Sequence, residues 1–140
     1  MTKPYHVIAG FWLTAGLVVG ICQLIRIQLA SFAILNHGLA FSINLPTLAI
    51  FVVMALFICL MIWLFYARQR LGWRWSVALG LIVGGGASNL VDRIILKGGV
   101  ADYWQIGNLS TINLADIAIT TGIIIAIWLL TTTYGTNRNI

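Results

Sequence analysis

The sequence predicts an all-α membrane protein with four transmembrane helices and short extended strands at the membrane surface between the first two. Two observations support this prediction. Of the 140 residues, 61% are hydrophobic and only 8% are charged, whereas soluble domains carry about 25% charged residues. Four apolar runs are each long enough to span a bilayer, at approximately residues 7–26, 46–66, 75–92 and 112–133. We therefore expect one integral membrane domain over residues 1–140.

The first two spans differ in how they begin. The run 7–26 is longer than the apolar region of a cleaved signal peptide, which reaches about 15 residues, so a retained helix is expected. Pro46 opens the second span, and proline costs little in the first turn of a helix. Between them, residues 28–45 alternate apolar and polar side chains, a pattern typical of short strands.

The third and fourth spans enclose a polar connection. Glycines in the third span would let a neighbouring helix approach closely, namely Gly80, Gly84, Gly85 and Gly86. Residues 93–111 are rich in glycine and polar groups, which predicts a loop. The fourth span is followed by a short polar tail.

The distribution of basic residues predicts the orientation. Cytoplasmic loops of membrane proteins carry an excess of Lys and Arg. With both termini in the cytoplasm, five cations lie on that side: Lys3, Arg68, Arg70, Arg74 and Arg138. Three remain outside: Arg26, Arg93 and Lys97. The net charge of +5 is spread thinly, which argues against a nucleic-acid partner. The histidines and cysteines lack metal-ligand spacing, so we expect no metal and no cofactor.

The acidic residues predict the functional site. The chain has only three, Asp92, Asp102 and Asp116, all within residues 84–116. A carboxylate in hydrocarbon costs roughly 2.5–3.5 kcal/mol, so such residues are seldom kept without a function. On a helix, Asn89, Asp92 and Arg93 would share one face, as would Asn113 and Asp116. This grouping would lie on the extracytoplasmic side.

Two of these aspartates could perform acid–base catalysis. Two carboxylates within hydrogen-bond reach share one proton; one then deprotonates a water while the other polarises a peptide carbonyl. Spacing leaves open whether Asp92 or Asp102 is the partner of Asp116. Two alternatives also remain: Asp92 simply pairs with Arg93 or Lys97, or the polar residues line a path through a small four-helix channel or transporter.

Four segments of the chain resemble motifs of one family, in the family's order. Residues 36–42 (NHGLAFS) resemble N-x-G-A-A-F-S, and residues 85–93 (GGASNLVDR) resemble G-G-A-x-G-N-x-x-D-R. Residues 100–103 (VADY) resemble V-V-D-F, and residues 112–116 (INLAD) resemble F-N-x-A-D. The chain is thus similar to the lipoprotein signal peptidases (signal peptidase II), four-span aspartic peptidases of the bacterial cytoplasmic (inner) membrane.

The resemblance implies a site and a substrate. Asp102 and Asp116 would be the catalytic pair, and residues 36–42 would belong to a small extracytoplasmic β-cradle between the first two helices. The substrate would be a diacylglyceryl-modified prolipoprotein, cut just before its lipidated cysteine. Membrane phospholipid and globomycin-like cyclic peptide inhibitors are further implied partners. The supporting residues would be Asn36, Gly38, Ala40, Phe41, Gly86, Asn89, Asp92, Arg93, Asn113, Ala115 and Arg26.

The chain departs from the family pattern in its first helix. The family carries D-Q-x-x-K where this chain has CQLIR at residues 22–26, so Cys22 replaces a carboxylate and Arg26 replaces a lysine. These changes leave the proposed pair intact but concern helix packing and substrate fit. They leave the alternative that the chain is a divergent paralogue, which binds lipoproteins but has little or no activity.

Overall fold

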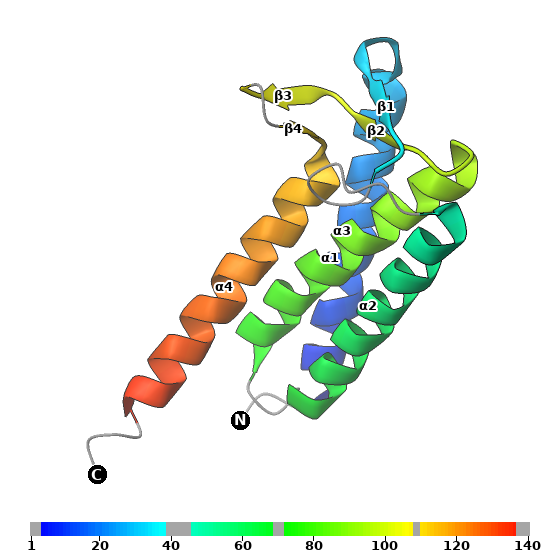
Figure 1. Ribbon diagram of the computed structural model, residues 1–140. Helices are drawn as coiled ribbons and strands as arrows, with labels where there is room; N and C mark the ends of the chain where they lie inside the picture. The colour runs from blue at the N-terminus through cyan, green and yellow to red at the C-terminus, as the bar shows by residue number, and fades with distance from the viewer. Residues whose placement is uncertain (1–3, 39–45, 69–71, 108–109, 137–140) are drawn as a thin grey trace.

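The computed structural model describes residues 4–38, 46–68, 72–107 and 110–136. It contains four long helices: α1 (Pro4–Gln28), α2 (Thr47–Arg68), α3 (Trp73–Ile95) and α4 (Leu114–Thr136). They lie side by side as a bundle (Figure 1). Each is long and apolar enough to cross a membrane. The predicted four-helix membrane fold is therefore confirmed.

Helix α3 is the centre of the bundle. The helices α1, α2 and α4 all pack against it. In its most apolar stretch 61% of the residues are buried, against 11–17% in the other three helices. Because α3 is shielded from lipid by its neighbours, it can carry the glycine, serine, asparagine and charged residues that a lipid-facing helix would expose to hydrocarbon.

Two glycines set the distance between α3 and its neighbours. A Cβ atom at Gly84 would lie 2.8 Å from the carbonyl oxygen of Ala15 on α1. A Cβ atom at Gly85 would lie 2.5 Å from the carbonyl oxygen of Ala115 on α4. The helix backbones therefore touch at these positions, as small residues permit in membrane bundles. Gly86 points elsewhere, toward Ile58 of α2, where a Cβ would find a contact at 3.4 Å.

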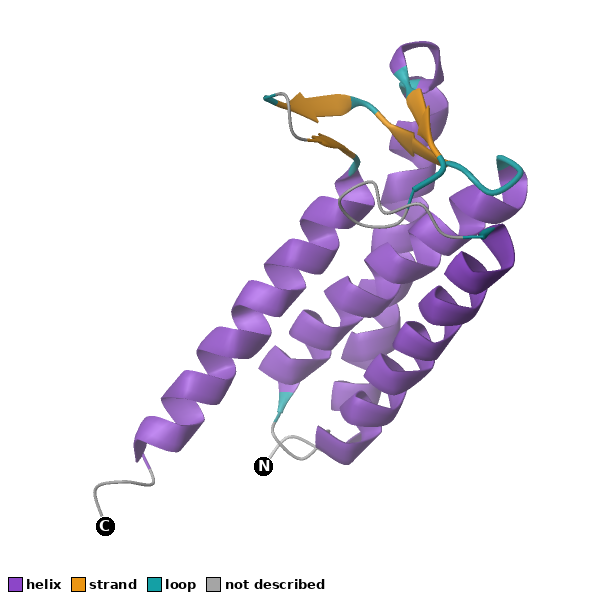
Figure 2. Cartoon of the chain, in the orientation of Figure 1, coloured by secondary structure: helices purple, strands orange, loops and turns teal. Residues whose placement is uncertain are grey.

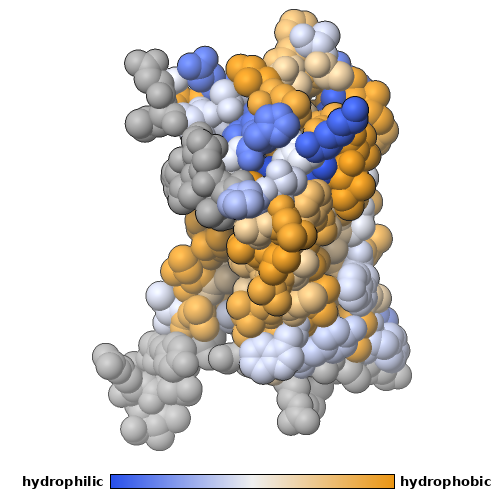
Figure 3. All heavy atoms as spheres, turned by 45° about the vertical axis from the view of Figure 1, so that its right-hand side comes forward, coloured by the Kyte–Doolittle hydropathy of each residue, from blue (hydrophilic) through white to orange (hydrophobic). Residues whose placement is uncertain are grey.

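The outer surface of the bundle is apolar. Large hydrophobic side chains are strongly exposed on the outer helices, among them Leu13 (64%), Leu56 (65%) and Ile124 (62%). Figure 3 shows apolar residues over the helices and polar residues gathered toward the end that carries the strands. Such a surface is stable when hydrocarbon surrounds it, so the chain is a multi-pass membrane protein.

The end of the bundle opposite the strands is closed by packed aromatic rings. Phe11 of α1 and Phe65 of α2 stack with ring centroids 4.0 Å apart, and both side chains are fully buried. Trp75 of α3 belongs to the same core. The hydroxyl of Ser76 donates a hydrogen bond to the carbonyl oxygen of Val7 at 2.8 Å. This end of the bundle is consequently dry and tightly packed.

Short strands cover the other end of the bundle (Figure 2). A 3₁₀ turn (Ala30–Phe32) leads into β1 (Ile34–Asn36), which pairs antiparallel with β2 (Val100–Asp102) so that Ile34 lies opposite Asp102. A hairpin follows, in which β3 (Trp104–Ile106) pairs with β4 (Ser110–Ile112).

The expected loop at residues 93–111 was wrong, because in the described part of the chain β2, β3 and most of β4 lie there. Only β1 lies between the first two helices, and residues 39–45, including Ala40 and Phe41, are outside the described part of the chain. Strands of three residues are too short to show alternation. The partner of β1 lies more than 60 residues away in sequence, so no local pattern reveals the pairing.

The close contact at Gly85 predicts that any side chain at this position lowers the stability of the bundle. We expect Gly85→Ala to push α4 away from α3 and to destabilise the bundle by about 1–3 kcal/mol, the usual range for overpacking. Thermal unfolding of the detergent-solubilised protein measures this. Gly86→Ala is the matched control on the next residue, where a Cβ is accommodated. Equal unfolding temperatures for the two variants would contradict the backbone contact.

Candidate active site

Asp116 is held by the first turn of α4. Its backbone N–H donates to Oδ1 of Asn113 (3.0 Å), and its Oδ2 accepts from the backbone N–H of Asn113 (3.1 Å). This is a reciprocal capping box, in which the residue before the helix and the third helical residue satisfy each other's backbone N–H groups. The local sequence NLAD thus fixes Asp116 in the first turn of α4.

Asp102 ends β2 and is only 2% exposed. Gly98, with a φ of +99°, ends the turn after α3 and lets the chain return over the end of that helix. Asn36 of β1 lies opposite Val100, so it is a diagonal neighbour of Asp102 on the same sheet face. Its Nδ2 donates to Oδ2 of Asp102 at 3.0 Å. The hydroxyl of Thr111 on β4 donates to the same oxygen, also at 3.0 Å.

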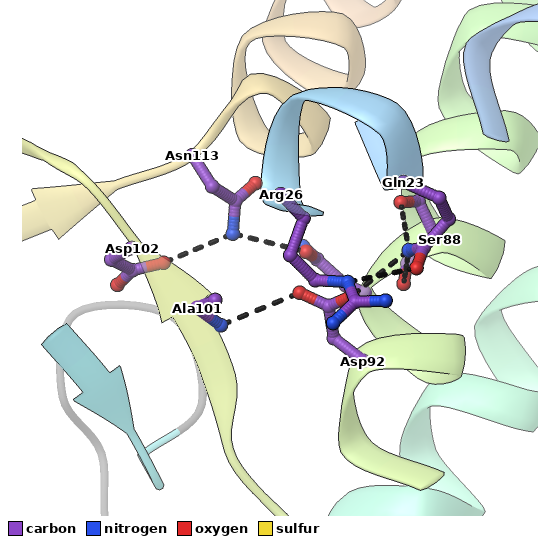
Figure 4. Close-up of polar contacts among 8 residues, drawn as sticks. Gln23, Arg26, Ser88, Asp92, Ala101, Asp102 and Asn113 are labelled. Atoms are coloured by element: carbon purple, nitrogen blue, oxygen red, sulfur yellow. Dashed lines mark hydrogen bonds and ion pairs between the residues drawn. The ribbon is translucent and has the colours of Figure 1, made fainter. Parts of the chain in front are cut away.

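Asn113 connects the two carboxylates. Its Nδ2 donates to Oδ1 of Asp102 at 3.0 Å (Figure 4) and to Oδ1 of Asn89 at 3.1 Å. Nδ2 of Asn89 in turn donates to Oδ1 of Asp116 at 2.9 Å. Asp102 and Asp116 therefore both bind Asn113, Asp102 through its side chain and Asp116 through its backbone N–H.

Asp92 lies in a separate network with α1 (Figure 4). Its Oδ1 accepts from Nε2 of Gln23 at 2.8 Å and pairs with Nε of Arg26 at 3.2 Å. Its Oδ2 accepts from the backbone N–H of Ala101 at 3.4 Å. The alternative in which Asp92 pairs with Arg93 or Lys97 is thus wrong, because the cation comes from another helix. Through Ala101, Asp92 holds the strand residue next to Asp102.

Arg93 joins α3 to one end of the β1–β2 pair, where the chain leaves β1 and enters β2. It is 5% exposed, and its two terminal nitrogens donate to the carbonyl oxygens of Gly98 (2.7 Å) and Gly38 (2.6 Å). The backbone N–H of Gly38 donates to Oδ1 of Asn36 at 2.9 Å. Because this fixes the amide orientation of Asn36, its NH₂ group must face Asp102. Arg93 therefore supports Asp102 through two intermediate residues.

Two of the remaining predicted residues, Ala115 and Gly86, lie at contacts between helices. Ala115 is 2% exposed and packs at the contact with Gly85, so its role is to let α4 approach α3. Gly86 faces α2 rather than the carboxylates. Ala40 and Phe41 lie outside the described residues. Within the described part of the chain, no three His, Cys, Asp or Glu side chains gather as a metal site.

Sequence reasoning missed several polar residues of the site. Gln23 donates to Asp92 and also to the hydroxyl of Ser88 at 3.1 Å. Its position one turn before Arg26 on α1 was a usable signal, because both side chains then share a face. Thr111 had no such signal, since its contact with Asp102 depends on the hairpin that places β4 beside β2.

Tyr103 follows Asp102 and is also tied to α4. Its backbone N–H donates to the carbonyl oxygen of Ile112 at 3.1 Å. Burial raises the pKa of the Tyr103 phenol, while a hydrogen bond with the backbone of Leu114 acts in the opposite direction. The phenol is therefore neutral at physiological pH and adds no negative charge to the three carboxylates.

The arrangement suits acid–base chemistry on a polar substrate atom. Three carboxylates and the guanidinium groups of Arg26 and Arg93 occupy one end of the bundle. Two positive charges balance two of the three carboxylates, so one shared proton makes the group neutral. A neutral total is required where burial penalises unpaired charge.

Comparisons with known proteins identify the family. The family described as "Signal peptidase (SPase) II" matches residues 6–132. The lipoprotein signal peptidase of Campylobacter jejuni (strain ATCC 700819) is 34% identical over 139 residues, covering 85% of each chain. That of Streptomyces griseus is 38% identical over 95 residues, covering 64% of this chain and 48% of the relative. The match to Streptomyces coelicolor covers 46% of the relative, so the chain spans about half the length of these Streptomyces relatives.

Solved structures show the same fold. A structure described as "Bacterial membrane enzyme structure by the in meso method at 2.3 A resolution" superposes with a TM-score of 0.82 at 20% identity, covering 95% of this chain and 94% of that one. A second, described in the same words at 1.9 A resolution, gives a TM-score of 0.73 at 22% identity over 88% of this chain and 93% of that one. With the family match over residues 6–132 and the relative from Campylobacter jejuni, the chain belongs to the signal peptidase II family.

Proposed function

We propose that the chain is a membrane aspartic endopeptidase that removes the signal peptide from diacylglyceryl-modified prolipoproteins, cutting just before the lipidated cysteine. The observation that carries this proposal is that Asp102 and Asp116 flank one asparagine, Asn113, at a single end of the helix bundle. The family and the names of the relatives support the substrate class. Asn36, Asn89, Asp92, Arg93 and Arg26 act as supports of the pair.

The reaction follows from two carboxylates with one proton between them. The ionised carboxylate takes a proton from a water molecule, whose oxygen attacks the carbonyl carbon of the scissile bond. The protonated carboxyl donates a hydrogen bond to the carbonyl oxygen and stabilises its developing charge. The tetrahedral intermediate then collapses, the carbon–nitrogen bond breaks, and a proton from the pair reaches the leaving amine. The two carboxyl groups share one proton again at the end.

The bilayer supplies the proximity of substrate and site. The apolar outer surface keeps the bundle in hydrocarbon, and a diacylglyceryl group anchors the substrate in the same layer. Diffusion is then confined to the membrane plane, and anchoring sets the depth of the scissile bond relative to the carboxylates. Globomycin-like cyclic peptides would compete for the same site, as the family resemblance implies.

We further propose that the protein lies in the bacterial cytoplasmic (inner) membrane, with both termini in the cytoplasm and the site on the opposite side. The start of α1 and the end of α4 lie together, at the end of the bundle away from the strands (Figure 1). Arg26 and Arg93, two of the three cations assigned to the outer side, bind Asp92 and backbone carbonyls in the site. Because these two cations bind groups in the site, their position outside the cytoplasm is weak evidence against this orientation.

The carboxylate pair predicts loss of cleavage in two single variants. We expect Asp102→Asn and Asp116→Asn each to reduce cleavage of a lipidated precursor by at least roughly 10²-fold, because general acid–base catalysis contributes about 10²–10⁴-fold. Asparagine keeps the shape of the side chain but has only one acceptor oxygen, so a donor to each residue loses its bond. Thermal unfolding therefore checks that both variants fold. Gel-shift processing of a purified precursor in detergent or liposomes measures the effect.

The same assay separates the peptidase from its alternatives. Wild-type protein that yields no peptide product but carries ions or solutes across liposomes would indicate a channel or transporter. Wild-type protein that binds the lipidated precursor without cutting it would indicate a silent paralogue. Full cleavage by either variant would exclude the proposed pair.

The network around Asp92 predicts a different phenotype. Asp92→Asn removes the partner of Arg26, so we expect a loss of about 3 kcal/mol in stability, as for a broken buried ion pair, with partial rather than complete loss of cleavage. Thermal unfolding and the processing assay are measured together. The double variant Asp92→Asn/Arg26→Gln should lose less stability than the two single variants together, because neither charge is then left without its partner. Complete loss of cleavage with normal stability would instead make Asp92 a member of the catalytic pair.

A further inference from the structure

Thr111 is the hydroxyl residue closest to the proposed reaction that none of the sequence motifs contains. It lies in β4, opposite Gln105 of β3. Its Oγ1 donates to Oδ2 of Asp102 at 3.0 Å. The hairpin carries this contact, since β4 leads directly into Asn113 and the start of α4. Thr111 therefore touches Asp102 from the segment that also positions Asp116.

The two carboxylates receive unequal numbers of hydrogen bonds. Oδ2 of Asp102 accepts from both Asn36 and Thr111, and Oδ1 accepts from Asn113. Because a carboxylate oxygen has two lone pairs, the two donors leave Oδ2 without a free site for a proton. Each oxygen of Asp116 accepts a single bond, from Asn89 or from the backbone of Asn113. The amide orientations of Asn36 and Asn113 are fixed by backbone N–H groups, and the Thr111 hydroxyl is the donor when Asp102 is ionised.

We propose that Thr111 is a positioning residue that keeps Asp102 in its ionised form, so that Asp102 is the base of the pair and Asp116 carries the shared proton. The inference rests on the proposed peptidase function and adds to it a division of roles. Hydrogen bonds donated to the charged form of a carboxylate favour that form. The hydroxyl also holds the carboxylate plane, which leaves the second lone pair of Oδ1 to accept a proton from water.

Other charges around Asp102 come from several elements and are unchanged by a substitution at Thr111. Asp92 and Arg93 of α3 and Asp116 of α4 act on it electrostatically, as does Tyr103 just after β2. Arg26 of α1 pairs with Asp92 instead. A change in pH dependence caused by a substitution at Thr111 therefore reports the lost hydroxyl rather than a lost charge.

The pH–rate profiles of Thr111→Val and Thr111→Ser test the proposal. Valine keeps the branched shape and lacks the donor, whereas serine restores it. We expect the acid limb of kcat for Thr111→Val to move up by about one pH unit, and cleavage on that limb to fall roughly tenfold with little change in KM. Thr111→Ser should return the profile toward that of the wild type. Ser110→Ala is the matched control, because that hydroxyl donates to a backbone carbonyl in the same strand.

Infrared titration gives a readout that needs no cleavage. The chain has only three acidic side chains, so the carbonyl band of protonated carboxyl groups is simple to follow. The band of Thr111→Val should persist to higher pH than those of the wild type and Ser110→Ala. If the wild type does not cleave, the peptidase function fails, while the titration still decides the part played by Thr111. Profiles and bands that are the same in Thr111→Val and the wild type would overturn the proposal, as would a serine variant as impaired as valine.

Discussion

The contact of Asn113 with both carboxylates is the interaction on which the site depends. Its backbone N–H and side-chain oxygen form the capping box with Asp116, and its NH₂ group reaches Asp102. One residue therefore starts α4, fixes one aspartate and orients the other. Because the capping box uses the side-chain oxygen, only the NH₂ group is left for Asp102. A hydrogen-bond donor between two carboxylates reduces their repulsion and lets them share a small space.

The rest of the bundle keeps this contact in place. Asp116 stays beside α3 because Gly85 allows the backbone of α4 to touch it at Ala115. Asp102 stays above α3 because Arg93 binds the carbonyl oxygens of Gly98 and Gly38, which lie together at one end of the strand pair. Backbone contacts and charged hydrogen bonds both resist small displacements. The central helix therefore sets the separation of two carboxylates that belong to other elements.

Several features of the site were accessible from sequence, and others were not. The relation of Asn113 to Asp116 was predicted as i, i+3 spacing, which is the spacing of a capping box. The four spans and the family were predicted and are confirmed. The alternative of a pair with Arg93 or Lys97 rested on cations close to Asp92 in sequence, whereas the structure pairs Asp92 with Arg26. Ion pairs between helices depend on how the helices are oriented relative to each other, and the spacing of residues along one helix does not predict this orientation.

The sequence by itself determined that the chain crosses a membrane with four helices and collects its acidic residues near one end, because hydropathy and helix length alone govern insertion. It also determined the local cap at the start of α4. Only the tertiary structure decided that Asn113 reaches Asp102, that β1 pairs with β2, and that Thr111 reaches Asp102. Each contact joins two separate elements, and the β1–β2 pair joins residues more than 60 positions apart, so the hydrogen bonds that define the site form only after the chain has packed.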